Sequence, residues 1–185
     1  MQTVSFINMA DGTKEEYEFL EELEKQYNST LAQRLIDSLR KLENSLSGYR
    51  VSRLEHSLQS ATRAYRNDED TEMVVAALLH DIGDDLAPYS HSEMAAAVLR
   101  PFVSDKIYWI IKHHGIFQMY YYAHHLGGDR NARDQFRDHP YYQPSVDFCE
   151  LYDQNCFDPD YDSLPLEFFE PILQAFFSRP PDFQH

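Results

Sequence analysis

Apolar residues recur at helical spacing along nearly the whole chain, and no segment reads convincingly as a strand. This spacing predicts helices over residues 13–27, 30–46, 51–66, 71–82, 90–99, 104–114, 145–156 and 164–177. The polar stretch 124–144 is expected to be a loop with one helical turn. The sequence therefore predicts an all-α fold, arranged as a single helical bundle.

Local signals predict where several of these helices begin or end. Ser90 and Glu93 form a capping-box pattern at the start of one helix, and Ser104 is expected to cap the next one. Gly83 suits the C′ position after the very apolar helix 71–82. Pro171 is expected to interrupt the last helix.

The composition narrows the partners that such a bundle can have. Asp and Glu outnumber Lys and Arg by 31 to 16, and the formal net charge of -15 disfavours nucleic acids and anionic membranes. No window approaches about 18 consecutive apolar residues, and the first residues lack a basic segment followed by an apolar run, so we expect no membrane span and no secretory signal. Cys149 and Cys156 build no disulfide framework. These features favour a cytoplasmic protein.

Imidazole and carboxylate side chains fall at helix positions where burial is expected. They are His56, His80, Asp81, His91, His114 and Asp153. Taken singly, each is more often a hydrogen-bonded core residue than a ligand. Taken together, they suit a transition metal such as iron, manganese or zinc. Six ligands exceed the need of one closed site, and Asp81 projects about 100° away from His80, so it could bridge two ions. We favour a site for two metals.

The order of these residues resembles the HD-domain superfamily. Its H…HD…D signature appears in the segments LEHSLQ, LLHDIGD and LYDQN, and the two additional histidines mark the branch with two metals. The resemblance covers about residues 46–157. It implies an HD domain over residues 46–185, including the C-terminal helix, preceded by two accessory helices in residues 1–45.

The superfamily contains metal-dependent phosphohydrolases and a smaller group of mixed-valent diiron oxygenases, which includes myo-inositol oxygenase and 2-amino-1-hydroxyethylphosphonate dioxygenase. The chain most resembles the oxygenases. Among them it is most similar to the subgroup that oxidatively cleaves (1R)-1-hydroxy-2-(trimethylamino)ethylphosphonate to glycine betaine and phosphate, through LEHSLQSA and the long stretch that begins at His124. The resemblance implies an Fe(II)/Fe(III) pair held by the six residues above, with Asp81 bridging. It also implies dioxygen and a small hydroxyphosphonate as substrates, the latter supplied by an upstream hydroxylase that is not a bound partner.

The sequence departs from the aminophosphonate enzyme at several positions. Where that enzyme has a histidine after the doublet, a lysine after the fifth ligand and an arginine before the last ligand, this chain has Asp84, Gln118 and Glu150. Leu46 and Tyr49 replace a loop tyrosine and an amine-binding glutamate. We expect Tyr49, Asp84 and Gln118 to lie at the substrate, but the family's phosphonate contacts are missing.

Basic residues of the polar stretch are candidates for those contacts. Arg130, Arg133 and His125 lie there, and guanidinium groups pair well with phosphonate oxygens. The alternative is that the arginines form ion pairs with the aspartates of the same stretch.

The replacement of a glutamate by Tyr49 suits a trimethylammonium group. Such a group has no N–H to donate, but an aromatic face attracts it by about 0.5–2 kcal/mol. The run Tyr120–Tyr122 could add to an aromatic cage, although ordinary core packing is the alternative for at least two of its members.

Two other functions remain open. A divalent-metal HD phosphohydrolase acting on a phosphomonoester or nucleotide would use the same ligands. A degenerate HD fold would serve as an interaction or ligand-sensing module. The lack of an obvious basic groove disfavours the first, and the presence of every ligand disfavours the second.

Overall fold

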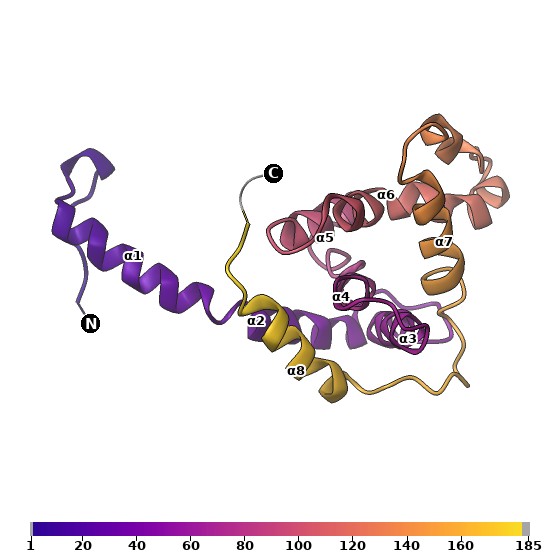
Figure 1. Ribbon diagram of the computed structural model, residues 1–185, viewed down its shortest axis with the longest axis horizontal. Coiled ribbons are helices and arrows are strands. Elements are labelled where there is room, and N and C mark those ends of the chain that lie inside the picture. The colour runs from indigo at the N-terminus through magenta and orange to yellow at the C-terminus, as the bar shows by residue number, and fades with distance from the viewer. Residues whose placement is uncertain (1, 183–185) are drawn as a thin grey trace.

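The computed structural model describes residues 2–182, which form α-helices and short 3₁₀ turns (Figure 1). The α-helices are α1 (Lys14–Asn28), α2 (Leu31–Lys41), α3 (Arg53–Arg66), α4 (Thr71–Leu79), α5 (His91–Leu99), α6 (Asp105–Tyr122), α7 (Tyr142–Tyr152) and α8 (Leu166–Phe177). The 3₁₀ turns are η1 (Met9–Asp11), η2 (Leu42–Asn44), η3 (Ala123–Leu126) and η4 (Ala132–Phe136). No strand occurs among residues 2–182, so the predicted all-α bundle is confirmed.

The centre of the core is α4. Every residue from Met73 to Leu79 is buried, which is the pattern of a helix that is covered on all sides. Helices α3, α6 and α8 pack around it. Because α4 is enclosed, the residues that follow its last turn are also placed inside the protein.

The first two helices differ in how they join this core. Helix α1 buries none of its residues and extends away from the other helices in Figure 1. Helix α2 places Leu35, Ile36 and Leu39 in the common core and packs against α8, where Arg40 forms an ion pair with Glu170. The division of the chain after residue 45 stays a prediction.

The end of α4 differs from the prediction. The helix stops at Leu79 rather than at residue 82, and turns follow it. Gly83 is therefore not a C′ residue. A Cβ atom at Gly83 would lie 2.7 Å from the carbonyl oxygen of His91. Close approach to the first residue of α5 is thus what requires glycine here.

Other predicted boundaries are confirmed in part. Ser90 precedes α5 as expected, but its side chain makes no capping bond, so the predicted capping box is wrong. The Oγ of Ser104 does cap α6 by accepting a bond from the N–H of Ile107. Pro171 does not interrupt α8, which continues through it because the helix is anchored on both sides by the fully buried Phe169 and Leu173.

The second half of the chain differs in helix length. Helix α6 runs through His114 as predicted and continues to Tyr122, and two 3₁₀ turns follow it within residues 123–136. Helix α7 ends at Tyr152, so Asp153 is its C-cap residue rather than a member of the helix. Both cysteines are buried and free. No helix among residues 2–182 combines the length and the apolar character needed to span a membrane.

Candidate metal centre

The six predicted ligands converge where five segments of the bundle meet. His56 comes from α3, His80 and Asp81 from the turn after α4, His91 from the start of α5, His114 from the middle of α6, and Asp153 from the C-cap of α7. His91 is half-buried and the other five are buried. The enclosed turn after α4 thus brings its histidine and aspartate to side chains from distant parts of the sequence.

Backbone carbonyls fix the orientation of three imidazoles. The Nδ1 atoms contact carbonyl oxygens at 3.0 Å (His56 to Cys156), 2.7 Å (His80 to Ala77) and 2.7 Å (His114 to Ile111). A carbonyl only accepts, so each Nδ1 carries the hydrogen that it donates. In the neutral ring, Nε2 then carries a lone pair, which is the arrangement of metal-ligating histidines.

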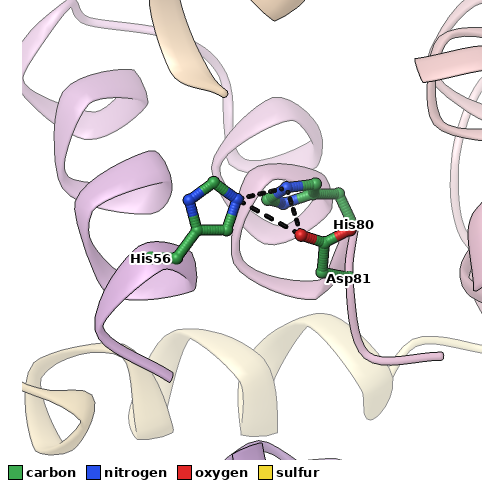
Figure 2. A group of neighbouring side chains, drawn as sticks. All are labelled: His56, His80 and Asp81. Atoms are coloured by element: carbon green, nitrogen blue, oxygen red, sulfur yellow. Dashed lines mark hydrogen bonds and ion pairs between the residues drawn. The ribbon is translucent and has the colours of Figure 1, made fainter. Parts of the chain in front are cut away.

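Two of these lone pairs face each other. The Nε2 atoms of His56 and His80 lie 3.1 Å apart, and Oδ2 of Asp81 lies 3.2 Å from each of them (Figure 2). Oδ1 of Asp153 lies 3.4 Å from the Nε2 of His56. Neutral imidazole nitrogens and carboxylate oxygens are all acceptors, so the group needs a cation, either a proton or a metal ion.

The second oxygen of Asp81 faces a second pair of histidines. Oδ1 lies 3.2 Å from the Nε2 of His114 and 3.5 Å from the Nε2 of His91. Asp81 belongs to two groups of potential ligands. One contains His56 and His80, and the other contains His91 and His114. Within each group the ligand atoms lie no more than 4.8 Å apart. Asp81 is therefore placed to bridge two neighbouring cations.

The electrostatics of the cluster fit a pair of metal ions. Burial would lower the pKa of His56, but hydrogen bonds with Asp153 and Asp81 raise it to about 9. Burial would raise the pKa of Asp81, but the charges of His80 and Arg53 hold it well below its usual value. The buried Oδ2 of Asp153 has no hydrogen-bond partner among the described residues. Charged carboxylates, convergent nitrogens and an unpartnered buried oxygen together form a suitable donor set for divalent ions.

A cavity of about 690 Å³ opens onto this centre. Asp81, His91, His114 and Asp153 line it, as do the aromatic residues Tyr49, Tyr121, Tyr122 and Phe157. The ring of Tyr49 stacks on Phe157 at 4.9 Å, and Phe157 stacks on the predicted ligand His56 at 4.3 Å. A continuous aromatic wall thus connects the half-exposed Tyr49 with the metal centre.

Three of the predicted substrate residues line the same cavity, namely Tyr49, Asp84 and Gln118. The Nε2 of Gln118 donates to Oδ1 of Asp153 at 2.9 Å, whereas its buried Oε1 has no partner among residues 2–182. Gln118 therefore orients one predicted ligand and keeps an acceptor free.

The other three predicted substrate residues, Arg130, Arg133 and His125, do not line the cavity. The guanidinium carbons of Arg130 and Arg133 lie 4.2 Å and 3.7 Å from the ring centroid of Tyr120. Neither arginine forms an ion pair with a described carboxylate, so the alternative pairing with neighbouring aspartates is not found either. Tyr120 faces these arginines, and only the other two members of its tyrosine run reach the cavity.

Sequence reasoning missed several cavity residues, among them Arg53 and Phe157. The side chain of Arg53 is buried and forms ion pairs with Asp81 and Asp84. Its position three residues before His56 on the same helix face was a usable signal. Phe157 follows α7 in an irregular segment, where no periodicity indicates the direction of a side chain.

Comparison with known proteins identifies the class. The family model for the HD domain matches residues 53–149, just over half of the chain, so the protein belongs to the HD domain family. The matched region contains five of the six predicted ligands, and Asp153 lies just beyond it.

A curated relative is similar to part of the chain. It is the [1-hydroxy-2-(trimethylamino)ethyl]phosphonate dioxygenase (glycine-betaine-forming) of Leisingera caerulea, with 37% identity over 78 residues, which cover 36% of this chain and 40% of the relative. The chain therefore matches less than half of the relative's length. The resemblance to the HD family and to this group of dioxygenases is confirmed.

Proposed function

We propose that the protein is a diiron oxygenase that cleaves the C–P bond of (1R)-1-hydroxy-2-(trimethylamino)ethylphosphonate. One dioxygen molecule supplies the two oxygen atoms that the products gain, and the substrate supplies the four electrons that reduce it. The products are glycine betaine, phosphate and a proton. The similarity to the Leisingera caerulea dioxygenase supports this choice of substrate.

The position of Asp81 carries the proposal. One of its oxygens faces His56 and His80, and the other faces His91 and His114. A single carboxylate between two pairs of imidazoles is suited to two adjacent ions. Iron ions bound there as an Fe(II)/Fe(III) pair would supply the redox chemistry on dioxygen.

The residues around the centre position the reactants. Carbonyl bonds at Nδ1 hold three of the imidazoles in one tautomer, and Gln118 holds Asp153. The fully buried ring of Phe148 packs against His80 and His114 and keeps water away from that side. The free Oε1 of Gln118 is suited to accept the hydrogen of the substrate hydroxyl.

The aromatic wall is suited to the cationic end of the substrate. Tyr49 and Tyr122 are about half exposed at the cavity, and Phe157 connects Tyr49 with the metal centre. A trimethylammonium group on these faces gains cation–π attraction without needing a hydrogen-bond acceptor. This arrangement separates the cation from the carbon that reacts.

The test is an oxygen-dependence experiment. The protein is loaded with iron under argon, partly oxidised, mixed with the hydroxyphosphonate and exposed to dioxygen. We expect phosphate and glycine betaine to appear in equal amounts, and only when dioxygen is consumed. A phosphomonoester serves as the second substrate. Phosphate release from that ester without dioxygen would contradict the proposal and identify an HD phosphohydrolase.

A further inference from the structure

Among the Asp, Glu, Lys and Arg side chains that line the cavity, all but one are acidic. Four aspartates line it, namely Asp81, Asp84, Asp85 and Asp153. Arg53 is the only lysine or arginine among its described lining residues. Two of the aspartates are predicted metal ligands, whose charges bound ions would offset. A substrate with a doubly charged acidic group therefore has one protein cation available to it in this cavity.

The guanidinium of Arg53 is held on one edge and open on the other. Its Nε donates to Oδ2 of Asp84 at 2.8 Å, and its Nη2 donates to Oδ2 of Asp81. Nη1 has no hydrogen-bond partner among residues 2–182. It is also not completely buried. Nη1 is therefore not fully enclosed by protein, and Arg53 is a lining residue of the cavity.

Asp84 lies between Arg53 and His91, which belongs to the second group of predicted ligands. Its Oδ2 accepts from Arg53, while its Oδ1 lies 3.5 Å from the Nδ1 of His91. The other three imidazoles use backbone carbonyls for this contact, so only His91 depends on a side chain. Asp84 thus holds the guanidinium of Arg53 in place, and its negative charge competes with an anionic substrate group for that guanidinium.

We propose that Arg53 anchors the acidic group of the substrate, binding its oxygens through the open side of the guanidinium while Asp84 limits the strength of that contact. The proposal rests on the proposed function, because it takes the acidic group to be a phosphonate. It gives the phosphonate a protein contact inside the cavity, which the arginines of the polar stretch do not reach. Arginine forks suit phosphonate oxygens through paired hydrogen bonds.

The test separates the two ends of the substrate. Iron-loaded protein under argon is titrated calorimetrically with methylphosphonate, which has only the acidic end, and with choline, which has the hydroxyl and the trimethylammonium group. We expect Arg53→Gln to weaken methylphosphonate binding about tenfold to a hundredfold, the effect of one lost charged hydrogen-bonding group. Choline binding should change less than about twofold. Arg53→Lys keeps the charge but loses the fork, so its affinity should be intermediate.

A second variant is expected to change methylphosphonate affinity in the opposite direction. Asp84→Asn removes a competing charge beside Arg53 but keeps an oxygen near His91, so methylphosphonate should bind several-fold more tightly. Iron content is measured for every variant, with wild-type content expected. If Arg53 only supports the fold or the ligand Asp81, both variants should weaken binding, and choline should be affected as strongly as methylphosphonate.

The possible failures can be told apart. If wild-type protein binds methylphosphonate and Arg53→Gln binds it equally well, the role of Arg53 is wrong and the proposed function is untouched. Equal weakening of both probes by Arg53→Gln, or weaker methylphosphonate binding by Asp84→Asn, also contradicts the role of Arg53. If the wild type binds neither methylphosphonate nor the full hydroxyphosphonate, the phosphonate assignment itself is overturned together with this proposal.

Discussion

Two regions of the molecule are rich in histidine, and only one of them gathers its histidines around buried carboxylates. In the segment 123–141, His124 and His125 lie against each other at 4.0 Å, and His139 stacks on Trp109 at 4.1 Å. No described carboxylate forms an ion pair with these three rings. At the junction of α3 to α7, four imidazoles face two buried carboxylates, and three of them are fixed by carbonyls. The comparison teaches that convergent acceptors, rather than the number of histidines, define the site.

The largest expected effect comes from removing the shared carboxylate. Asp81→Ala should lose both iron ions and reduce oxygen-dependent phosphate release by at least about a thousandfold, since metal ligands and catalysis are lost together. His125→Ala, in the contrasting segment, should keep wild-type iron content and activity. Metal analysis and the phosphate assay measure both. If the two variants bind equal amounts of iron, the distinction between the regions is wrong.

The pH dependence of metal binding comes next in size. The pKa of His56 rises from 6.5 to about 9 in the metal-free protein, because its bonds with Asp153 and Asp81 outweigh the effect of burial. A metal must displace this proton, so zinc affinity should increase about tenfold per pH unit from neutral pH and level off above the raised pKa. Titration against a competing chelator at several pH values measures the zinc affinity.

The stability of the metal-free protein should change in the opposite direction. The raised pKa of His56 stabilises the fold fully below pH 6.5, and this contribution is lost as the pH rises through about 9. Chemical denaturation of metal-free protein should show that decrease, and His56→Gln should reduce both the decrease and the slope in zinc affinity. A zinc affinity that does not vary across this range would contradict the protonated cluster.

A smaller effect is expected at the aromatic wall. Tyr49→Glu should lower the preference for the trimethylammonium substrate over the primary amine by about threefold to thirtyfold, through loss of a cation–π face and gain of a hydrogen-bond acceptor. The ratio of kcat/KM for the two substrates measures this preference. Tyr89→Glu, at a fully exposed position, is the matched control. An unchanged or higher ratio in Tyr49→Glu would contradict the role of Tyr49.

The smallest effect is expected outside the cavity. Arg130→Gln should change the dissociation constant of methylphosphonate by less than about twofold, because its guanidinium lies against Tyr120 and not in the cavity. Calorimetry on iron-loaded protein compares it with Arg53→Gln. A larger loss in Arg130→Gln than in Arg53→Gln would place the phosphonate with the polar stretch, as the sequence alone suggests.

The sequence predicts the convergence of these six side chains, because a polar residue on an apolar helix face has to be satisfied by something inside the fold. Three predicted ligands, His56, His91 and His114, lie within helices, where periodicity fixes the direction of a side chain. The irregular parts are different. The turn at Gly83 and the position of Phe157 depend on close contacts between distant segments, which no local pattern encodes.

The arginines show the same limit. Arg53 and Arg133 are both buried, and their residue type gives no indication of which one reaches the cavity. The orientation of α6 decides this, since it turns Tyr121 and Tyr122 towards the cavity and Tyr120 towards the polar stretch. Helix orientation arises from packing across the whole bundle, so charge and composition could not predict it.

The central claim is that one carboxylate joins two metal ions, and electron paramagnetic resonance of half-oxidised, iron-loaded protein tests it most directly. A shared Asp81 would couple two bound ions magnetically. We therefore predict the signal of an antiferromagnetically coupled Fe(II)/Fe(III) pair, which is lost in Asp81→Ala and kept in His125→Ala. A signal of isolated high-spin Fe(III) in the wild type, with one iron bound per chain, would contradict the account.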